Sequence, residues 1–210
     1  MPICLDTFDE DEIIKTVKYL APNFSAIMLE DISAPKCVRI ESVLQEDLDI
    51  PVFHDDQHGT AIVVGAALLN ALKIVKKPIN EISVVVSGSG AAGSAIIKML
   101  NRLGVKKIYN YNILGVVSEH KYPQYDWVLQ KLIDENYIVA DVQANSLSQL
   151  VEKKDVFIGV SAKNLLKDND VKNMNEDAIV FALANPEPEI NPLIAKSAGA
   201  RIVDTNRSDF

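Results

Sequence analysis

Two pairs of adjacent acidic residues each directly follow an apolar segment. Glu30 and Asp31 come after SAIML, and Asp55 and Asp56 come after IPVFH. Carboxylates that converge at the ends of neighbouring parallel strands repel one another unless a hard divalent cation neutralises them, and ligand sets made only of oxygen suit Mg²⁺ or Mn²⁺ better than zinc. Alternatively, each pair caps the helix that follows it. Both a metal site and a pair of helix caps fit the pattern.

His54 and His58 frame the second acidic pair. Two histidines four positions apart would favour zinc if the stretch were helical. Phe53 instead indicates that the stretch lies at the end of a strand. We therefore expect the two imidazoles to bond neighbouring carboxylates or the backbone.

A glycine-rich motif lies between the apolar segment ISVVVS and a predicted helix. It consists of Gly88, Ser89, Gly90, Ala91, Ala92 and Gly93. In a dinucleotide-binding fold the first glycine makes the tight turn, the second lets the backbone approach a pyrophosphate, and the third packs the helix on the strand. The alternative is a strand-to-helix turn without a ligand. Because the predicted strands form a parallel sheet, we favour the dinucleotide site.

The next predicted strand ends in Asn112, where such folds usually place an acidic residue that binds the ribose 2′-hydroxyl. An amide can still bond this hydroxyl, but it lacks the charge that repels the 2′-phosphate of NADP. We therefore expect NAD, with NADP as the alternative.

The elements that must position these residues alternate between strand and helix. Apolar runs, among them residues 25–29, 50–53, 82–86, 156–160 and 179–183, are separated by helical patterns. This alternation predicts an α/β fold: a Rossmann-like parallel sheet with helices on both faces, preceded by part of a smaller α/β substrate and metal domain. We expect domains at 1–75 and 76–210, a short strand at 2–6, and a buried helix at 60–75.

Composition and charge exclude several classes of function. The 210 residues carry a net charge of −8, and residues 1–75 account for all of it with 13 acids and 5 bases. A nucleic-acid partner is therefore not expected. The longest apolar run, AIVVGAALL, is about half a membrane span, and the N-terminus is acidic, so we expect no membrane partner and a cytoplasmic location. Cys4 and Cys37 lack metal or redox spacing and are expected to be buried.

Five separated strings together resemble the malic enzymes, in particular the shorter bacterial type. They are FSAIMLEDISAP, IPVFHDDQHGTAIV, VVVSGSGAAG, DVFIGVS and FALANPEPEI. The resemblance covers nearly the whole chain but only about the middle half of a family chain. It implies NAD(P), L-malate and Mg²⁺ or Mn²⁺, with oxidation of malate to oxaloacetate and decarboxylation to pyruvate, in a protein that is a homodimer or larger.

The resemblance also implies roles for particular residues. It places the metal ligands at Glu30, Asp31 and Asp56, and makes Asp55 a supporting acid that orients the site. Asn185 corresponds to an asparagine that contacts the substrate. The glycine motif corresponds to the pyrophosphate loop, and Thr60 and Ser161 to positions on the nicotinamide side.

The chain also departs from the family pattern. The tyrosine acid, the lysine base and an arginine that binds substrate precede the matched region in the family, so this chain alone is not expected to be competent. Asn112 and Asn206 replace an aspartate and a glycine of family motifs. Two alternatives remain: a module that binds NAD or malate without turnover, and a malolactic reaction that releases lactate.

Overall fold

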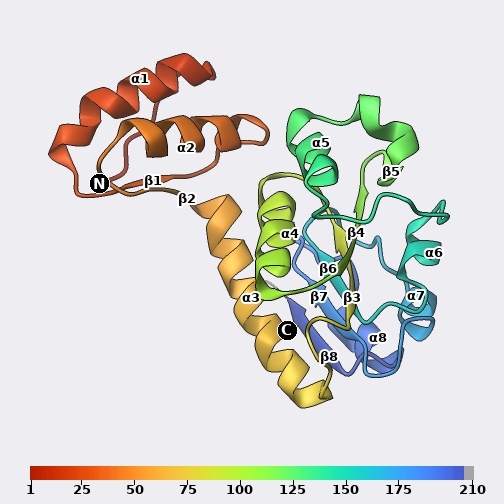
Figure 1. The fold of residues 1–210 in the computed structure, drawn as a ribbon. Helices are drawn as coiled ribbons and strands as arrows, with labels where there is room; N and C mark the ends of the chain where they lie inside the picture. The colour runs from red at the N-terminus through yellow and green to blue at the C-terminus, as the bar shows by residue number, and fades with distance from the viewer. Residues whose placement is uncertain (206–210) are drawn as a thin grey trace.

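The computed structural model describes residues 1–205 and places them in a small outer layer and a larger sheet domain joined by one long helix (Figure 1). Asn206 lies outside the described residues. In chain order the elements are α1 (Glu10–Leu20), η1 (Ala21–Asn23), β1 (Ile27–Leu29), α2 (Lys36–Asp47), β2 (Val52–His54), α3 (Asp55–Val75), β3 (Ser83–Ser87), α4 (Ala91–Leu103), β4 (Lys107–Asn112), β5 (Gly115–Val116), η2 (Glu119–Gln124), α5 (Trp127–Asp134), α6 (Leu147–Val151), β6 (Val156–Gly159), α7 (Asp168–Lys172), β7 (Ile179–Ala182), α8 (Pro192–Ser197) and β8 (Ile202–Thr205).

The larger domain is built on a six-stranded sheet of order β5-β4-β3-β6-β7-β8. Its strands are parallel except for the short edge strand β5, which pairs antiparallel with β4. From β3 the chain first runs outward to β4 and then returns to the other side at β6. The order in which the chain adds strands to the sheet therefore reverses between β3 and β6, and α/β folds of this kind bind ligands at such a point.

Alternating side chains of the strands fill two cores, one on each face of the sheet. Val84 and Val86 of β3 pack with side chains of α3, α4 and α5, whereas Val85 and Phe157 pack with side chains of α6, α7 and α8. Each strand is therefore apolar on both faces, as expected for a covered parallel sheet. The predicted α/β fold with helices on both faces is confirmed.

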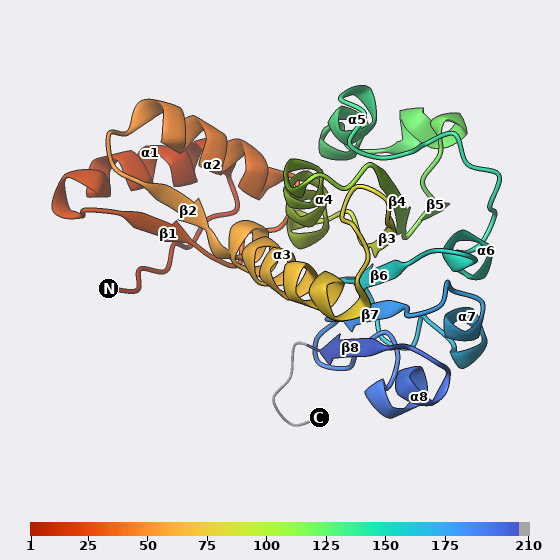
Figure 2. The ribbon, with the colours of Figure 1, turned by 60° about the horizontal axis from the view of Figure 1, so that its bottom comes forward.

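The small layer consists of the two parallel strands β1 and β2 beneath α1 and α2 (Figure 2). Its separate core contains Ile13 of α1, Ile40 and Leu44 of α2, Leu29 of β1 and Val52 of β2. The strand predicted at residues 2–6 is wrong, because this segment pairs with no strand within residues 1–205 and is coil. Apolar residues alone do not make a strand without a neighbour that accepts its hydrogen bonds.

Helix α3 begins at the acidic pair Asp55-Asp56 and runs along the large domain, where it packs on α4 (Figure 2). The expectation that this helix is buried on all sides is wrong. One side is buried, but its outward side exposes Ile62 at 53%, Val63 at 64% and Ile74 at 61%. Within residues 1–205, α3 is the helix long and apolar enough to cross a membrane, a test that core helices of soluble proteins also pass.

The core contacts of α3 bear on how the chain divides. Its Val64 and Leu68 belong to the core of the large domain, whereas Leu44 and Val52 belong to that of the small layer. The boundary between 75 and 76 stays a prediction.

Of the two cysteines, Cys37 is buried as expected and desolvation raises the pKa of its thiol to about 11, but Cys4 is exposed, contrary to expectation.

Candidate functional site: a dinucleotide loop beside two acidic strand ends

The glycine motif forms the turn between β3 and α4. Gly88 has a φ of +116°, a conformation that side chains rarely adopt, and its N–H donates to the Tyr111 carbonyl at 2.7 Å. Gly93 lies directly against Gly88, because a Cβ at Gly93 would overlap the Gly88 carbonyl. These two glycines are therefore required by the turn itself.

The middle glycine is different, because a Cβ built at Gly90 meets no atom within 4 Å. Gly90 is exposed, has an extended backbone with a φ of −74°, and is the N-cap residue of α4, where no side chain caps the helix. The protein itself gives no packing reason for glycine here. An open space beside an uncapped helix N-terminus is the arrangement that accepts a phosphate group.

Asn110 secures the loop from the neighbouring strand, and it was missed from the sequence. Its side chain is 1% exposed, and Nδ2 donates to the carbonyls of Val86 and Gly88, both at 2.9 Å. A polar residue at a buried position in the middle of a strand was the signal that could have found it.

Asn112 lies at the end of β4 and faces the same loop. Its Nδ2 donates to Ser89 Oγ at 3.3 Å, and its Oδ1 accepts from the Leu114 N–H at 2.8 Å. The structure thus places the predicted ribose-binding residue beside the glycine loop.

The loops after β6 and β7 bring Ser161 and Asn185 to the same edge of the sheet. Ser161 Oγ lies 2.8 Å from the Oγ of Ser87, the last residue of β3, so the β6 loop is joined to the start of the glycine loop. Asn185 is exposed three residues after the end of β7 and forms a cis peptide bond with Pro186. Thr60 lies in the early part of α3 and is partly buried.

The two acidic pairs lie at the carboxyl ends of β1 and β2. These strands are parallel with Leu29 opposite His54, so Glu30 and Asp31 leave the small sheet beside Asp55 and Asp56. The Asp31 N–H donates to Asp56 Oδ2 at 3.1 Å, and Asp31 has a φ of +58°. Asp55 and Asp56 also form the first turn of α3, where carboxylates stabilise the helix dipole.

His54 is fully buried, and neither of its ring nitrogens has a hydrogen-bond partner among residues 1–205. Its Nε2 lies 3.6 Å from Asp56 Oδ2. Desolvation lowers the pKa of His54, although the neighbouring Asp56 opposes this shift. The imidazole thus presents an unpartnered nitrogen toward the acidic pairs.

Glu41 of α2 organises the start of α3, and it too was missed from the sequence. Its carboxylate is 5% exposed and accepts from the His54 N–H at 2.8 Å and from Gln57 Nε2 at 3.1 Å, with His58 Nε2 at 2.8 Å. The expectation that the histidines bond carboxylates or backbone holds for His58. Contrary to expectation, the stretch is not all strand, since His58 lies within α3.

The donor set fits a hard divalent cation in its chemistry. Carboxylates from two adjacent parallel strands leave the same edge of the small sheet, and the backbone N–H of Asp31 donates to the Asp56 carboxylate. Among the described residues, the buried His54 ring nitrogen that lies nearest to Asp56 has no hydrogen-bond partner. Within residues 1–205, however, no three His, Cys, Asp or Glu side chains are already gathered closely enough to hold an ion.

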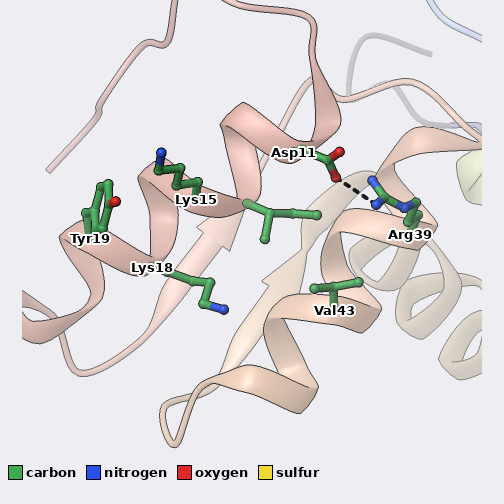
Figure 3. A pocket seen from close by; sticks show the side chains of 7 residues that line it. Asp11, Lys15, Lys18, Tyr19, Arg39 and Val43 are labelled. Carbon is green, nitrogen blue, oxygen red and sulfur yellow. Dashed lines mark hydrogen bonds and ion pairs between the residues drawn. The ribbon is translucent and has the colours of Figure 1, made fainter.

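A surface groove of about 420 Å³ lies elsewhere, between α1 and α2 (Figure 3). Its basic side chains are engaged: Lys18 pairs with Asp47 at 2.8 Å, Arg39 pairs with Asp11 at 2.7 Å, and Lys15 lies over the Tyr19 ring. None of the residues predicted from the sequence to form the site lines this groove. The chemistry-bearing residues are at the strand ends instead.

Comparison with known proteins agrees with this geometry. Residues 57–198 match the family model described as malic enzyme, NAD binding domain. The chain is 50% identical to an NAD-dependent malic enzyme of Geobacillus stearothermophilus, covering 100% of this chain and 43% of the relative. It is 46% identical to a bifunctional malic/malolactic enzyme of Bacillus subtilis, covering 100% and 50%.

A solved structure supports the same relationship. The NAD-dependent malic enzyme of Thermotoga maritima superposes with a TM-score of 0.93 at 48% identity, covering 100% of this chain and 55% of that one. The chain thus spans about half the length of these relatives. With its glycine loop and two-sided parallel sheet, this chain belongs to the malic enzyme family and contains the family's NAD-binding domain.

Proposed function

We propose that this chain supplies the nucleotide and metal sites for the oxidative decarboxylation of L-malate to pyruvate and CO₂, with reduction of NAD. The observation that carries the proposal is the open cradle at Gly90, at the N-terminus of α4 and beside the switch between β3 and β6. A Cβ there would meet no atom of the described residues within 4 Å.

The dinucleotide would bind with its pyrophosphate on the loop from Gly88 to Gly93, where helix N–H groups and the helix dipole favour an anion. Asn112 would bond the adenosine ribose, since its side chain already faces Ser89 of this loop. Its neutral amide supports NAD as the cofactor and leaves NADP as an alternative. The nicotinamide would extend toward Ser161, which contacts the start of the loop through Ser87.

Glu30, Asp31 and Asp56 would hold Mg²⁺ or Mn²⁺. A bound ion of this kind acts as a Lewis acid on the hydroxyl and keto oxygens of the substrate. Asp31 already donates its N–H to Asp56, so the protein brings two of the three residues together through the backbone. Asp55, in the first turn of α3, would support their orientation.

Asn185 would contact the malate. It is exposed in the turn after β7, and Ser161 follows the neighbouring strand β6, so the substrate-side and nicotinamide-side residues come from the ends of adjacent strands. Residues that hold both ligands at adjacent strand ends would raise the rate by orienting malate relative to the nicotinamide. We further propose that the full protein is a homodimer or a larger homo-oligomer.

The test is a reaction of the purified chain with L-malate, Mn²⁺ and either NAD or NADP, in which reduced nicotinamide, pyruvate and lactate are all quantified. Binding of NAD and Mn²⁺-dependent binding of malate are expected, and any product should be pyruvate with an equal amount of reduced nicotinamide. Lactate without net reduction would favour the malolactic alternative. Binding of both ligands by the complete protein without any product would favour the non-catalytic module.

A further inference from the structure

Glu189 is a fully buried carboxylate to which the sequence analysis assigned no role. Its side chain is 0% exposed and lies in the segment that follows β7. Oε1 accepts from the Ser161 N–H at 2.9 Å, and Oε2 accepts from the Ala184 N–H at 3.0 Å. One side chain therefore joins the loop after β6 to the turn after β7.

The surrounding backbone is shaped to receive this carboxylate. The Glu189 carbonyl accepts from the Leu166 N–H at 3.1 Å, which holds a second part of the β6 loop against the same segment. Gly159, the last residue of β6, faces the side chain, and a Cβ at Gly159 would overlap the Glu189 carboxyl group. The pocket therefore requires a glycine on one side and accepts a carboxylate on the other.

A carboxylate is the side chain that suits these two donors. No salt bridge within residues 1–205 includes Glu189, and its burial raises its pKa, although the N–H groups of Ser161 and Ala184 oppose that shift. Glutamine at this position offers one acceptor oxygen, so one of the two amides would face an NH₂ group. Each carboxylate oxygen thus accepts one backbone N–H, and these hydrogen bonds offset the free-energy cost of burying the acid.

We propose that Glu189 is a positioning residue that holds the loop of Ser161 and the turn of Asn185 in a defined position relative to each other. It would thereby align the nicotinamide side of the cofactor with the substrate. This inference rests on the proposed function. Ala184 immediately precedes Asn185, and Ser161 contacts Ser87 at the start of the glycine loop at 2.8 Å. A single network of hydrogen bonds thus runs across the carboxyl ends of β3, β6 and β7.

Asp155 provides a matched control at the opposite edge of the same sheet. It is also a buried carboxylate, and it accepts from the Ser83 N–H at 2.8 Å and from Lys77 Nζ at 2.9 Å. Asp155→Asn removes an acceptor of the same kind without touching the carboxyl ends of the strands. It reports on the effect of lost stability alone.

The experiment compares wild type, Glu189→Gln, Glu189→Asp and Asp155→Asn by calorimetric titration with NAD, and with L-malate in the presence of NAD and Mn²⁺. Amide signals of Ser161 and Ala184 are followed by NMR. We expect Glu189→Gln to weaken both ligands by about tenfold and to shift both amide signals, because a hydrogen bond to a charged group is lost. Glu189→Asp, which keeps both acceptors, should recover part of the affinity, and Asp155→Asn should bind as wild type does.

Two results would overturn the inference. One is a folded Glu189→Gln variant that binds both ligands as wild type does, and the other is an equal loss in Glu189→Gln and Asp155→Asn. If the wild-type chain itself failed to bind NAD, the proposed nucleotide site would be refuted first, together with the inference that depends on it. The two failures are therefore distinguishable.

Discussion

Replacing Gly90 with alanine should separate ligand binding from stability. Because a Cβ at Gly90 meets nothing within 4 Å and the backbone has a φ of −74° and a ψ of −157°, the folded chain accommodates alanine without strain. Alanine stabilises by about 0.4–1 kcal/mol by restricting the unfolded chain. It is a poorer N-cap than glycine by a comparable amount, roughly 0.5 kcal/mol. The free energy of unfolding should therefore change by less than about 0.5 kcal/mol.

The same methyl group would occupy the space that a pyrophosphate needs for close approach to the backbone. NAD affinity should fall by at least tenfold, which corresponds to about 1.4 kcal/mol, and Gly90→Val should lose more. Urea unfolding measures the stability and calorimetric titration measures the dissociation constant. Gly93→Ala is the contrasting variant, because its Cβ would overlap the Gly88 carbonyl and should cost roughly 1–3 kcal/mol of stability. Unchanged NAD affinity in a folded Gly90→Ala would refute the assignment of the loop.

Three further predictions concern neighbouring parts of the structure. Asn112→Asp should raise the preference for NAD over NADP by about tenfold, because a carboxylate beside Ser89 repels a 2′-phosphate; an unchanged ratio in parallel titrations would contradict this. Glu41→Gln should lower the free energy of unfolding by about 1–3 kcal/mol and destabilise the start of α3, because the two oxygens of Glu41 accept hydrogen bonds from three donors. Faster hydrogen exchange of the His54 amide than in the exposed control variant Glu46→Gln would be the measured effect. Burial opposes the ionisation of Asp155, but hydrogen bonds from Lys77 and Ser83 outweigh it and lower its pKa from 3.8 to about 2. The folded pKa lies below the unfolded value, so this stabilisation is present above pH 3.8 and is lost as the pH falls toward 2. Denaturant titrations should show a loss of about 2 kcal/mol over this range, and Asp155→Asn should remove the pH dependence.

The glycine motif could be predicted from residue spacing because its residues are local to one turn. Gly88 has a positive φ and Gly93 lies against the Gly88 carbonyl five residues earlier, so their spacing indicated the turn before the structure did. The structure adds that a Cβ at Gly88 would also meet Val160, a distant contact that the spacing does not reveal. The apolar runs likewise identified the sheet, because a strand covered on both faces has few polar positions.

The residues that were missed depend on partners from distant segments. Asn110 bonds a loop that begins over 20 residues earlier, Glu41 serves donors on β2 and α3, and Glu189 bonds the amide of Ser161. The role of a buried polar side chain can be assigned only once its hydrogen-bond partners are known, and sequence periodicity does not identify them. The exposure of Ile62 and Val63 was missed for the converse reason, since composition shows that a helix is apolar but not which of its sides is covered.

The most direct test of the account is calorimetric titration of L-malate into the NAD-bound chain with and without Mn²⁺, repeated with Asp56→Ala. We expect malate to bind only when Mn²⁺ is present, and we expect Asp56→Ala to abolish this binding while NAD affinity stays unchanged. Exposed Glu46→Gln serves as the matched acidic control. Malate binding that is independent of Mn²⁺, or unchanged in Asp56→Ala at saturating Mn²⁺, would contradict the assignment of the acidic pairs as the metal site.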